Sequence, residues 1–357
     1  MAEAKIIKKI GVLTSGGDAP GMNAAIRAIT DKALEQGIEV VGVIGGYSGL
    51  INDKIIPLTS EFVNSIVGLG GTRLYSDRCV EFKTEEGMAK AIATCKKLGI
   101  EGLVTIGGDG TFQGATELSI RGIPCVGIPG TIDNDVSSTD NTIGYDTAMN
   151  TVTELVDKLR DTCESHARCN VVEVMGRDAG DIALNTAIAS GATAVAIPEF
   201  TFDEEALFEK IATSRKLGKR NFIVIISEGL GSDYAPTLAT KIESKTGVET
   251  KFARFAHIVR GGNPTVRDRL LATEMGAFAV EKLLEGKSNI VICERNGEIV
   301  EGDIGYALKI DRMYKGKLKE GDLDAYSKET IEQMQKECVE RRAAMQKLYD
   351  IQKKVNL

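Results

Sequence analysis

The sequence predicts an α/β fold of two doubly wound lobes, each on a mostly parallel sheet, with an active-site cleft between them. Three observations support this prediction. Short apolar strands alternate with amphipathic helices, glycine-rich turns follow several strands, and 357 residues suffice for two lobes of ordinary size. Hydrophobic residues make up 43% of the chain and charged residues 27%, a globular composition that excludes extensive disorder.

The first half of the chain begins with a predicted βαβ unit. Residues 10–13 form an apolar strand, 15–21 a glycine-containing loop and 40–44 a second strand. Between them a helix is predicted from an apolar stripe at helical spacing, formed by Met22, Ile26, Ile29 and Ala33. The pattern repeats in a helix at 85–98, a strand at 102–106, a helix opened by 107–110 and a strand at 126–128.

The second half continues in the same style. Its predicted elements are a helix striped by Ala148, Val152, Leu155 and Leu159, strands at 170–174, 222–226 and 290–293, and a helix near 268–284. Residues 182–197 are apolar but polar side chains interrupt them, so we interpret them as buried core. From Lys328 an amphipathic helix, interrupted by Arg341, is expected to dock on its own subunit or a neighbour.

Charge and cysteine usage restrict the class of protein. Acidic residues outnumber basic ones by 51 to 44, and aromatic residues are 5% with no Trp, which disfavours a nucleic-acid-binding surface. Seven cysteines without a CxxC pair indicate reduced thiols rather than disulfides or a metal–thiolate site. Residues 1–9 show no apolar export signal. We therefore expect a cytoplasmic protein.

Three loops directly follow predicted strands and carry the candidate chemistry. They are Gly16–Asp18, Gly107–Thr111 and Pro129–Asp135. Ligands of open parallel sheets bind beyond the carboxyl ends of the strands, so these loops can converge on one crevice. Glycine pairs let a phosphate approach the backbone, and helix-start N–H groups favour an anion. Neither GxxxxGK[ST] nor GxGxxG is present, so these loops match neither of those phosphate-binding motifs.

Three carboxylates lie in these loops: Asp109, Asp133 and Asp135. A transferring phosphoryl group needs a hard cation, which carboxylates bind, and an acceptor hydroxyl needs a carboxylate base in line with it. The alternative is that Asp133 and Asp135 only stabilise an Asx-type turn. The residues alone leave both interpretations open.

Five motifs in order resemble bacterial 6-phosphofructokinases. They are Lys9–Asn23, Gly107–Thr111, Pro129–Asp135, Val171–Arg177 and His257–Gly262, and the resemblance runs from Lys9 to about Arg312. It implies a nucleotide-binding lobe of residues 1–144 plus 264–312. The sugar-phosphate-binding lobe would be 145–263 plus 313–357, with a C-terminal helical extension. The implied enzyme is a cytoplasmic homotetramer whose subunits share active sites. It transfers phosphate from MgATP to the 1-hydroxyl of fructose 6-phosphate in glycolysis.

The resemblance also implies roles for individual residues. Asp133 is the expected base, supported by Thr131 and Asp135, and Asp109 is the expected magnesium ligand. The transferring phosphate is expected at Gly17, Arg78 and Arg177. Nucleotide binding is expected from Gly17, Tyr47, Arg78, Cys79, Lys83, Gly110, Thr111 and Gly114. Substrate binding is expected from Thr131, Asp133, Arg168, Met175, Gly176, Arg177, Glu228, Lys251, His257 and Arg260, with Arg168 reaching across from a neighbouring subunit.

Several of these residues have a plainer interpretation. Lys83 is also consistent with a solvated surface charge, Cys79 with a packing residue and Tyr47 with a capping aromatic. Without its motif, His257 is interpreted as a core histidine. Lys251 stands where the family has a second intersubunit arginine, and Arg254 is an alternative for that contact.

The resemblance also bears on the phosphate donor and on regulation. Pyrophosphate-using relatives carry aspartate and lysine at the positions of Gly110 and Gly130, so glycine at both favours ATP. Arg27, Arg160 and Lys219 match basic positions of the bacterial effector site. Asp31, Ser60 and Leu217 replace basic residues there, which predicts weak or altered control by a nucleoside diphosphate or phosphoenolpyruvate.

Three other functions remain as alternatives. A pyrophosphate-dependent enzyme differs only in its donor. A GGDG-containing kinase of lipids or NAD is disfavoured by the sugar-side set Met175, Glu228, His257 and Arg260. A catalytically silent sugar-phosphate-binding subunit is disfavoured by the presence of Asp109, Asp133 and Arg177.

Overall fold

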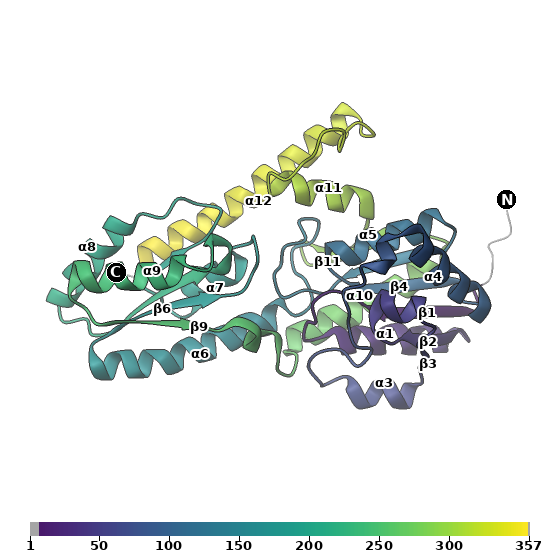
Figure 1. The fold of residues 1–357 in the computed structure, drawn as a ribbon, viewed down its shortest axis with the longest axis horizontal. Coiled ribbons are helices and arrows are strands. Elements are labelled where there is room, and N and C mark those ends of the chain that lie inside the picture. Colours follow the sequence, from purple (N-terminus) through teal and green to yellow (C-terminus); the bar gives the residue numbers. More distant parts are fainter. Residues whose placement is uncertain (1–6, 356–357) are drawn as a thin grey trace. The chain divides into compact units, whose positions relative to one another are not determined.

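The computed structural model describes residues 7–355, and the chain divides into two compact units (Figure 1). Unit 1 comprises the chain up to Ile132, Val136–Thr147 and Arg260–Tyr326. Unit 2 comprises Asp133–Asp135, Ala148–Val259 and the chain from Ser327 onward. Most of the N-terminal stretch examined for an export signal, residues 1–6, lies outside the described residues.

Unit 1 is built on a seven-stranded sheet in the order β11-β10-β5-β4-β1-β2-β3. Only the two edge strands, β3 and β11, pair antiparallel to their neighbours, so the predicted mostly parallel sheet is confirmed. The strands are β1 Lys9–Thr14, β2 Glu39–Val43, β3 Ile55–Pro57, β4 Gly102–Gly107, β5 Cys125–Pro129, β10 Ile290–Arg295 and β11 Glu298–Asp303. The two edge strands were not predicted from the sequence.

Helices cover both faces of this sheet. One group contains α1 Met22–Glu35, α3 Ser60–Ile66 and α10 Val266–Leu284. The other contains α2 Gly46–Ile51, α4 Glu85–Leu98, α5 Asp109–Ile120, α11 Ile304–Tyr314 and the short 3-10 turn η1 Glu81–Lys83. Side-chain caps fix several helix starts: Thr84 accepts from the N–H of Gly87 on α4, and Thr265 accepts from that of Asp268 on α10.

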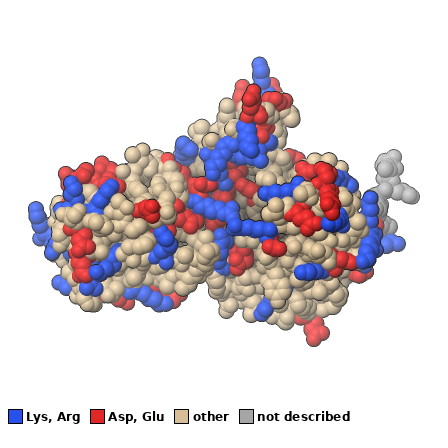
Figure 2. All heavy atoms as spheres, in the orientation of Figure 1, with Lys and Arg blue, Asp and Glu red and all other residues tan. Residues whose placement is uncertain are grey.

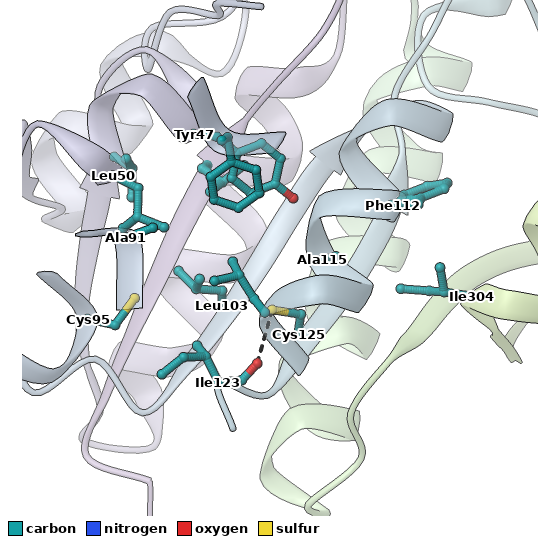
Figure 3. Packing of buried hydrophobic residues seen from close by; sticks show 14 of the residues in the cluster. Tyr47, Leu50, Ala91, Cys95, Leu103, Phe112, Ala115, Ile123, Cys125 and Ile304 are labelled. Carbon is teal, nitrogen blue, oxygen red and sulfur yellow. Dashed lines mark hydrogen bonds between the residues drawn. The ribbon is translucent and has the colours of Figure 1, made fainter. Parts of the chain in front are cut away.

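The second helix group packs on the sheet through a fully apolar core (Figure 3). Leu103 of β4 and Phe112 and Ala115 of α5 have no exposed surface. A Cβ at Gly127 of β5 would lie 2.7 Å from the Phe112 ring, so glycine there allows α5 to pack closely on the sheet. This core fixes the start of α5 relative to the end of β4.

Unit 2 contains a four-stranded, fully parallel sheet in the order β7-β8-β6-β9. Its strands are β6 Cys169–Val174, β7 Ala194–Ala196, β8 Phe222–Ser227 and β9 Thr250–Arg254. Its helices are α7 Asp181–Ala189, α8 Glu204–Lys216, α9 Tyr234–Thr246 and α12 Lys328–Val355, with the 3-10 turn η2 Glu228–Leu230. The helix α6 Tyr145–His166 begins in unit 1 and runs into unit 2, and the 3-10 turn η3 Ala256–Arg260 ends at the first residue of unit 1's last segment.

The C-terminal helix α12 docks on its own subunit, which is one of the two arrangements expected from the sequence. It packs on α7 and β7. The Gln352 amide donates to the Ala192 carbonyl oxygen at 3.1 Å, and the ring centroids of Tyr349 and Phe200 are 4.9 Å apart. Gln352 and Tyr349 are both buried, so the C-terminal end of α12 is anchored independently of Arg341.

The two units differ from the expected lobes in four places, residues 133–135, 145–147, 260–263 and 313–326. Asp133–Asp135 belongs to unit 2 because Asn134 hydrogen-bonds to Asp181 and Arg341 there. Residues 313–326 belong to unit 1, since Asp322 accepts from Lys309 and Arg312 of α11. Residues 145–147 and 260–263 also belong to unit 1, whose segments end at Thr147 and resume at Arg260.

The structure shows the distribution of charge on one face and the state of the cysteines. Lys, Arg, Asp and Glu are interspersed on the face of each unit drawn in Figure 2. All seven cysteines are free thiols, and five of them are buried. Across residues 7–355, we find no helix with the length and apolarity that a bilayer crossing requires.

Candidate active site

Unit 1 brings the three glycine loops together at the carboxyl edge of its sheet. The strand order changes direction between β1 and β4, and ligands of doubly wound folds bind at such a point. The Ser15 N–H donates to the Ile106 carbonyl oxygen at 3.0 Å, and the Thr111 hydroxyl donates to the Ser15 carbonyl oxygen at 3.0 Å. The Gly130 N–H donates to the Gly107 carbonyl oxygen at 3.0 Å. The first two loops and the start of the third, up to Ile132, therefore converge within unit 1, whereas Asp133–Asp135 belongs to unit 2.

Glycine is required where these loops touch. A Cβ at Gly107 would lie 2.4 Å from the Ser15 carbonyl oxygen, and one at Gly17 would lie 2.6 Å from a guanidinium nitrogen of Arg260. The same nitrogen of Arg260 donates to the Asp18 carbonyl oxygen at 3.2 Å. Arg260, which was expected on the sugar side, thus contacts the first glycine loop.

The start of α5 is open to an anion. Its N-cap residue, Gly108, provides no side-chain cap, so no capping side chain occupies the helix start. The Gly108 carbonyl oxygen accepts from the N–H of Thr111 at 2.9 Å and from that of Phe112 at 3.1 Å. Gly110 is exposed, and a Cβ there would meet no atom within 4 Å. The site therefore combines the positive end of a helix with free space at residue 110.

Tyr47, Thr111 and Gly114 form a packed group behind this helix start. The Tyr47 hydroxyl donates to the Thr111 carbonyl oxygen at 2.6 Å, and the Tyr47 ring stacks on Phe82 with centroids 4.0 Å apart. A Cβ at Gly114 would lie 2.6 Å from that ring. Burial raises the pKa of Tyr47 well above its ordinary value, so its hydroxyl remains a donor. Tyr47 is a buried support for α5 in this structure.

The remaining expected nucleotide residues lie on the segment that follows α3. Arg78 and Lys83 are exposed, whereas Cys79 packs against the core cluster. This segment is tied to the first strand and loop, because the Ser76 hydroxyl donates to the Gly16 carbonyl oxygen at 2.5 Å and the Thr14 hydroxyl to that of Tyr75 at 2.9 Å. Arg78 therefore lies two residues from a direct contact with the first loop.

Two residues near Asp109 were missed by sequence reasoning. The Lys315 ammonium group lies 3.9 Å from a carboxylate oxygen of Asp109 and 2.8 Å from one of Asp311. Asp311 is buried and also accepts from the Ser137 hydroxyl at 2.9 Å. The i, i+4 spacing of Asp311 and Lys315 is visible in the sequence, but their approach to Asp109 depends on the packing of α11 on α5.

Unit 2 carries the expected catalytic carboxylate. Asp133 has no exposed side-chain surface, and its Oδ2 lies 3.1 Å from Nε of Arg177. The Arg177 side chain is half exposed, so the same guanidinium contacts both Asp133 and solvent. The structure thus brings together two residues that the sequence separates by 44 positions.

Glu228 holds the loop that carries Arg177. Its carboxylate accepts from the N–H of Gly176 at 3.1 Å and from that of Arg177 at 2.8 Å. Arg177 has a left-handed φ of 52°, and a Cβ at Gly229 would lie 2.4 Å from the Arg177 carbonyl oxygen. Glu228 is therefore a positioning group in this structure. Met175 directly precedes Gly176 in the chain and follows the last residue of β6.

Arg168 and Lys251 converge on one carboxylate, Glu249. Arg168 Nε lies 2.6 Å and Lys251 Nζ 2.9 Å from its two oxygens, and these cations lower the pKa of Glu249 to about 2. The Arg254 guanidinium instead lies 2.6 Å from the buried Glu173 and also donates to the Ser232 carbonyl oxygen. Lys251 and Arg168 thus share one surface, whereas Arg254 is engaged elsewhere.

Three further expected residues have distinct environments. His257 is exposed, so its interpretation as a core histidine is wrong. Thr131 is 8% exposed, and its carbonyl oxygen accepts from the Thr142 hydroxyl. Asp135 is also 8% exposed, in the segment that packs within unit 2.

Several polar residues at the expected effector positions form ion pairs or hydrogen bonds within their own unit. In unit 1, Arg27 Nε lies 3.2 Å from the Asp31 carboxylate, which also accepts from the Ser60 hydroxyl at 3.1 Å. In unit 2, Arg160 donates to Asn221 and to the Ser190 carbonyl oxygen. Leu217 is 84% exposed. Asp31 therefore neutralises Arg27 within unit 1.

The fold and these loops define a doubly wound α/β protein with glycine-rich loops at the carboxyl edge of its larger sheet. The Phosphofructokinase family model matches residues 9–283, so the chain belongs to that family. It is 52% identical over 298 residues to an ATP-dependent 6-phosphofructokinase of Bacillus licheniformis, covering 84% of this chain and 93% of that protein. It is 52% identical over 314 residues to ATP-dependent 6-phosphofructokinase 1 of Clostridium perfringens, covering 88% and 98%.

A solved structure of phosphofructokinase from Saccharomyces cerevisiae is similar with a TM-score of 0.84 and 30% identity. The match covers 96% of this chain, and the chain spans about half, 49%, of that yeast chain. A pyrophosphate-dependent phosphofructokinase from Marinobacter aquaeolei shares the fold, with a TM-score of 0.73 at 22% identity.

Proposed function

We propose that this protein is an ATP-dependent 6-phosphofructokinase of glycolysis, which converts fructose 6-phosphate and ATP to fructose 1,6-bisphosphate and ADP. The observation that carries the proposal is the buried Asp133 carboxylate at 3.1 Å from the Arg177 guanidinium, in a chain about half identical to enzymes of that name. A carboxylate base and an arginine are the groups that phosphoryl transfer to a hydroxyl requires.

In this mechanism Asp133 accepts the proton of the sugar 1-hydroxyl. The hydroxyl oxygen forms a bond to the γ-phosphorus of ATP, and ADP leaves with the electrons of the broken bond. Arg177 donates to the phosphoryl oxygens, where negative charge develops in the transition state. The half-exposed Arg177 side chain suits this role because it reaches solvent while contacting Asp133.

Magnesium is part of the proposal, with Asp109 as the residue that would hold it. When bound, Mg²⁺ neutralises charge on the β- and γ-phosphate oxygens. A single protein carboxylate is compatible with this metal, which retains several waters and takes other ligands from phosphate. Asp109 is one-third exposed at the first residue of α5, and residues 7–355 contain no cluster of three or more acidic, His or Cys ligands. The donor set therefore fits a metal that arrives with the nucleotide.

The open space at Gly110 supports ATP as the donor. A nucleoside triphosphate brings an α-phosphate and a nucleoside beyond the two phosphates of pyrophosphate, so it needs more room beside the helix start. A Cβ at Gly110 meets no atom within 4 Å, whereas one at Gly130 would lie 3.0 Å from Ile106. A side chain at position 110 would therefore project into the space that a ligand can occupy, and not against other protein atoms.

The assembly is proposed to be a homotetramer in which Arg168 and Lys251 contact the sugar phosphate of a neighbouring subunit. Their shared surface beside Glu249 is the support for assigning them together. The proposal also includes a cytoplasmic location, with which seven free thiols agree.

Replacing Asp133 by Ser should abolish most turnover, because the sugar hydroxyl loses its base. We expect kcat to fall by about 10²- to 10⁴-fold. The measurement is aldolase-coupled detection of fructose 1,6-bisphosphate, with ATP and with pyrophosphate, in the presence and absence of magnesium. Asp157→Ser, at an exposed position of α6, is the matched control and should retain wild-type kcat. Faster turnover with pyrophosphate than with ATP would contradict the donor assignment, and near-wild-type turnover in Asp133→Ser would remove the base.

Replacing Gly110 by Asp should impair ATP binding selectively. The added carboxylate repels phosphate, and we expect the KM for ATP to rise at least ~10-fold, equivalent to about 1.4 kcal/mol. Gly110→Ala is the control, since its methyl group meets open space and should change KM little. An equal rise in both variants would show that volume rather than charge decides. Initial rates at varied ATP provide the measurement.

Lys251→Ala and Arg254→Ala should affect different properties, the first the KM for fructose 6-phosphate and the second the melting temperature. Loss of Lys251 should raise the KM for fructose 6-phosphate several-fold with little change in melting temperature, because its ammonium group is exposed. Loss of Arg254 should lower the melting temperature, because the buried Glu173 loses its cation. Substrate titrations and thermal unfolding of both variants separate these outcomes. An unchanged KM in Lys251→Ala with a raised KM in Arg254→Ala would reverse the assignment.

The fructose 6-phosphate saturation curve should respond weakly to ADP or phosphoenolpyruvate. Asp31 already neutralises Arg27 at the effector position and would repel an anionic ligand. We expect the half-saturation point to move less than about twofold at millimolar effector, below 0.4 kcal/mol of coupling. The Asp31→Asn variant should respond more strongly than wild type. A strongly sigmoidal curve that either ligand shifts would contradict this expectation.

A further inference from the structure

Helix α12 contacts the segment that contains the proposed base. Nη2 of Arg341 donates to the carbonyl oxygen of Asn134 at 2.9 Å. Asn134 is the residue between Asp133 and Asp135, and Arg341 is largely buried, with 21% of its side chain exposed. The polar residue that interrupts the apolar stripe of α12 therefore contacts the backbone of the catalytic segment.

Asn134 adopts a conformation that needs support from its surroundings. Its φ of 50° is in the left-handed region, which costs free energy for a residue other than glycine, although asparagine tolerates it better than most. Its amide donates to Oδ1 of Asp181 at 3.3 Å, and Nη2 of Arg341 lies 3.8 Å from the same oxygen. Asn134 is thus held at its side chain by Asp181 of α7 and at its backbone carbonyl by Arg341 of α12.

Arg341 also compensates negative charge at this place. The segment and the elements against it carry the carboxyl groups of Asp133, Asp135, Asp181 and Glu199. Arg177 contacts Asp133, and the charge of Arg341 acts on Asp181 and Glu199. Burial raises the pKa of Asp181 and of Glu199, and the charge of Arg341 opposes both shifts. Removing the guanidinium therefore removes both a hydrogen bond and a neighbouring positive charge.

We propose that Arg341 is a positioning residue for phosphoryl transfer, which holds the Asn134 peptide so that Asp133 stays against Arg177. This inference rests on the proposed function of Asp133. It makes the C-terminal helix part of the catalytic machinery rather than an appended stabilising element. The three-residue segment Asp133–Asp135 supports this, because it packs in unit 2 while the chain on both sides of it belongs to unit 1.

A purely structural role for Arg341 makes a different prediction. Tyr349 and Gln352 anchor α12 on unit 2 without Arg341, so the helix should stay docked when the guanidinium is removed. A structural role would lower stability and leave the kcat of the folded enzyme unchanged. A positioning role lowers kcat and leaves the KM values nearly unchanged, because the contacts described above join Arg341 to Asn134 and Asp181, neither of which is an expected substrate-binding residue.

The test compares Arg341→Met with Arg342→Met, which removes the same charge from an exposed position of the same helix. We expect kcat of the full-length Arg341→Met enzyme to fall at least ~10-fold, with the KM for ATP and fructose 6-phosphate within about threefold of wild type. Arg341→Lys, which keeps the charge and one donor, should recover part of kcat. Amide hydrogen exchange at residues 133–136 should accelerate in Arg341→Met but not in Arg342→Met.

Several results would overturn the proposal. A kcat for Arg341→Met within twofold of that for Arg342→Met would do so, as would a raised KM with unchanged kcat. If Arg341→Met fails to fold, Arg341→Lys and Arg341→Gln decide, and wild-type kcat in both rejects the positioning role. A wild-type enzyme that is inactive with ATP and fructose 6-phosphate rejects the proposed function instead. The exchange measurement then still reports whether Arg341 restrains Asn134, and unchanged exchange rejects that restraint.

Discussion

The burial of Asp133 is the constraint on which the proposed chemistry depends. A carboxylate with no exposed side-chain surface is costly to bury unless a cation or hydrogen-bond donors compensate its charge. Arg177 supplies that compensation from the loop after β6, and Glu228 at the end of β8 fixes the backbone that carries Arg177. The position of one carboxylate therefore depends on two strands of the unit 2 sheet.

In unit 1 the corresponding constraint is steric. Three chain segments meet at the ends of β1, β4 and β5, and they meet closely enough that Gly107 has no room for a side chain. The hydrogen bonds between Ser15, Ile106 and Thr111 then hold the loops in one arrangement. A phosphate ligand would meet backbone N–H groups already oriented by this packing, which limits the ordering cost of binding.

Most charged groups at the candidate site already have partners of opposite charge in the protein. Lys315 lies near Asp109, Arg177 near Asp133, and Glu249 near Arg168. Such pairs hold flexible side chains in place before a ligand binds, and preorganised charge is the main electrostatic contribution to catalysis. The same pairs weaken the attraction of each arginine for a phosphate, because the neighbouring carboxylate competes with it.

The sequence by itself determined the α/β fold class, the predicted central strands and helices, and the loops that carry the chemistry. These features follow from local rules, since apolar periodicity defines strands and helices and glycine pairs define tight turns. It did not identify the edge strands of either sheet, β3 and β11 in unit 1 and β7 and β9 in unit 2, which are three to six residues long. The family motifs named Asp133 and Arg177, but nothing in the sequence placed them 3.1 Å apart.

Only the tertiary structure decided which charges became partners. Arg341 is read in the sequence as an interruption of an apolar stripe, and its contact with Asn134, 207 positions earlier, requires α12 to dock on α7. Lys251 and Arg254 likewise pair with different carboxylates, Glu249 and Glu173, although only two residues separate them in the sequence. Such contacts arise from the packing of distant elements, and local sequence patterns carry no information about that packing.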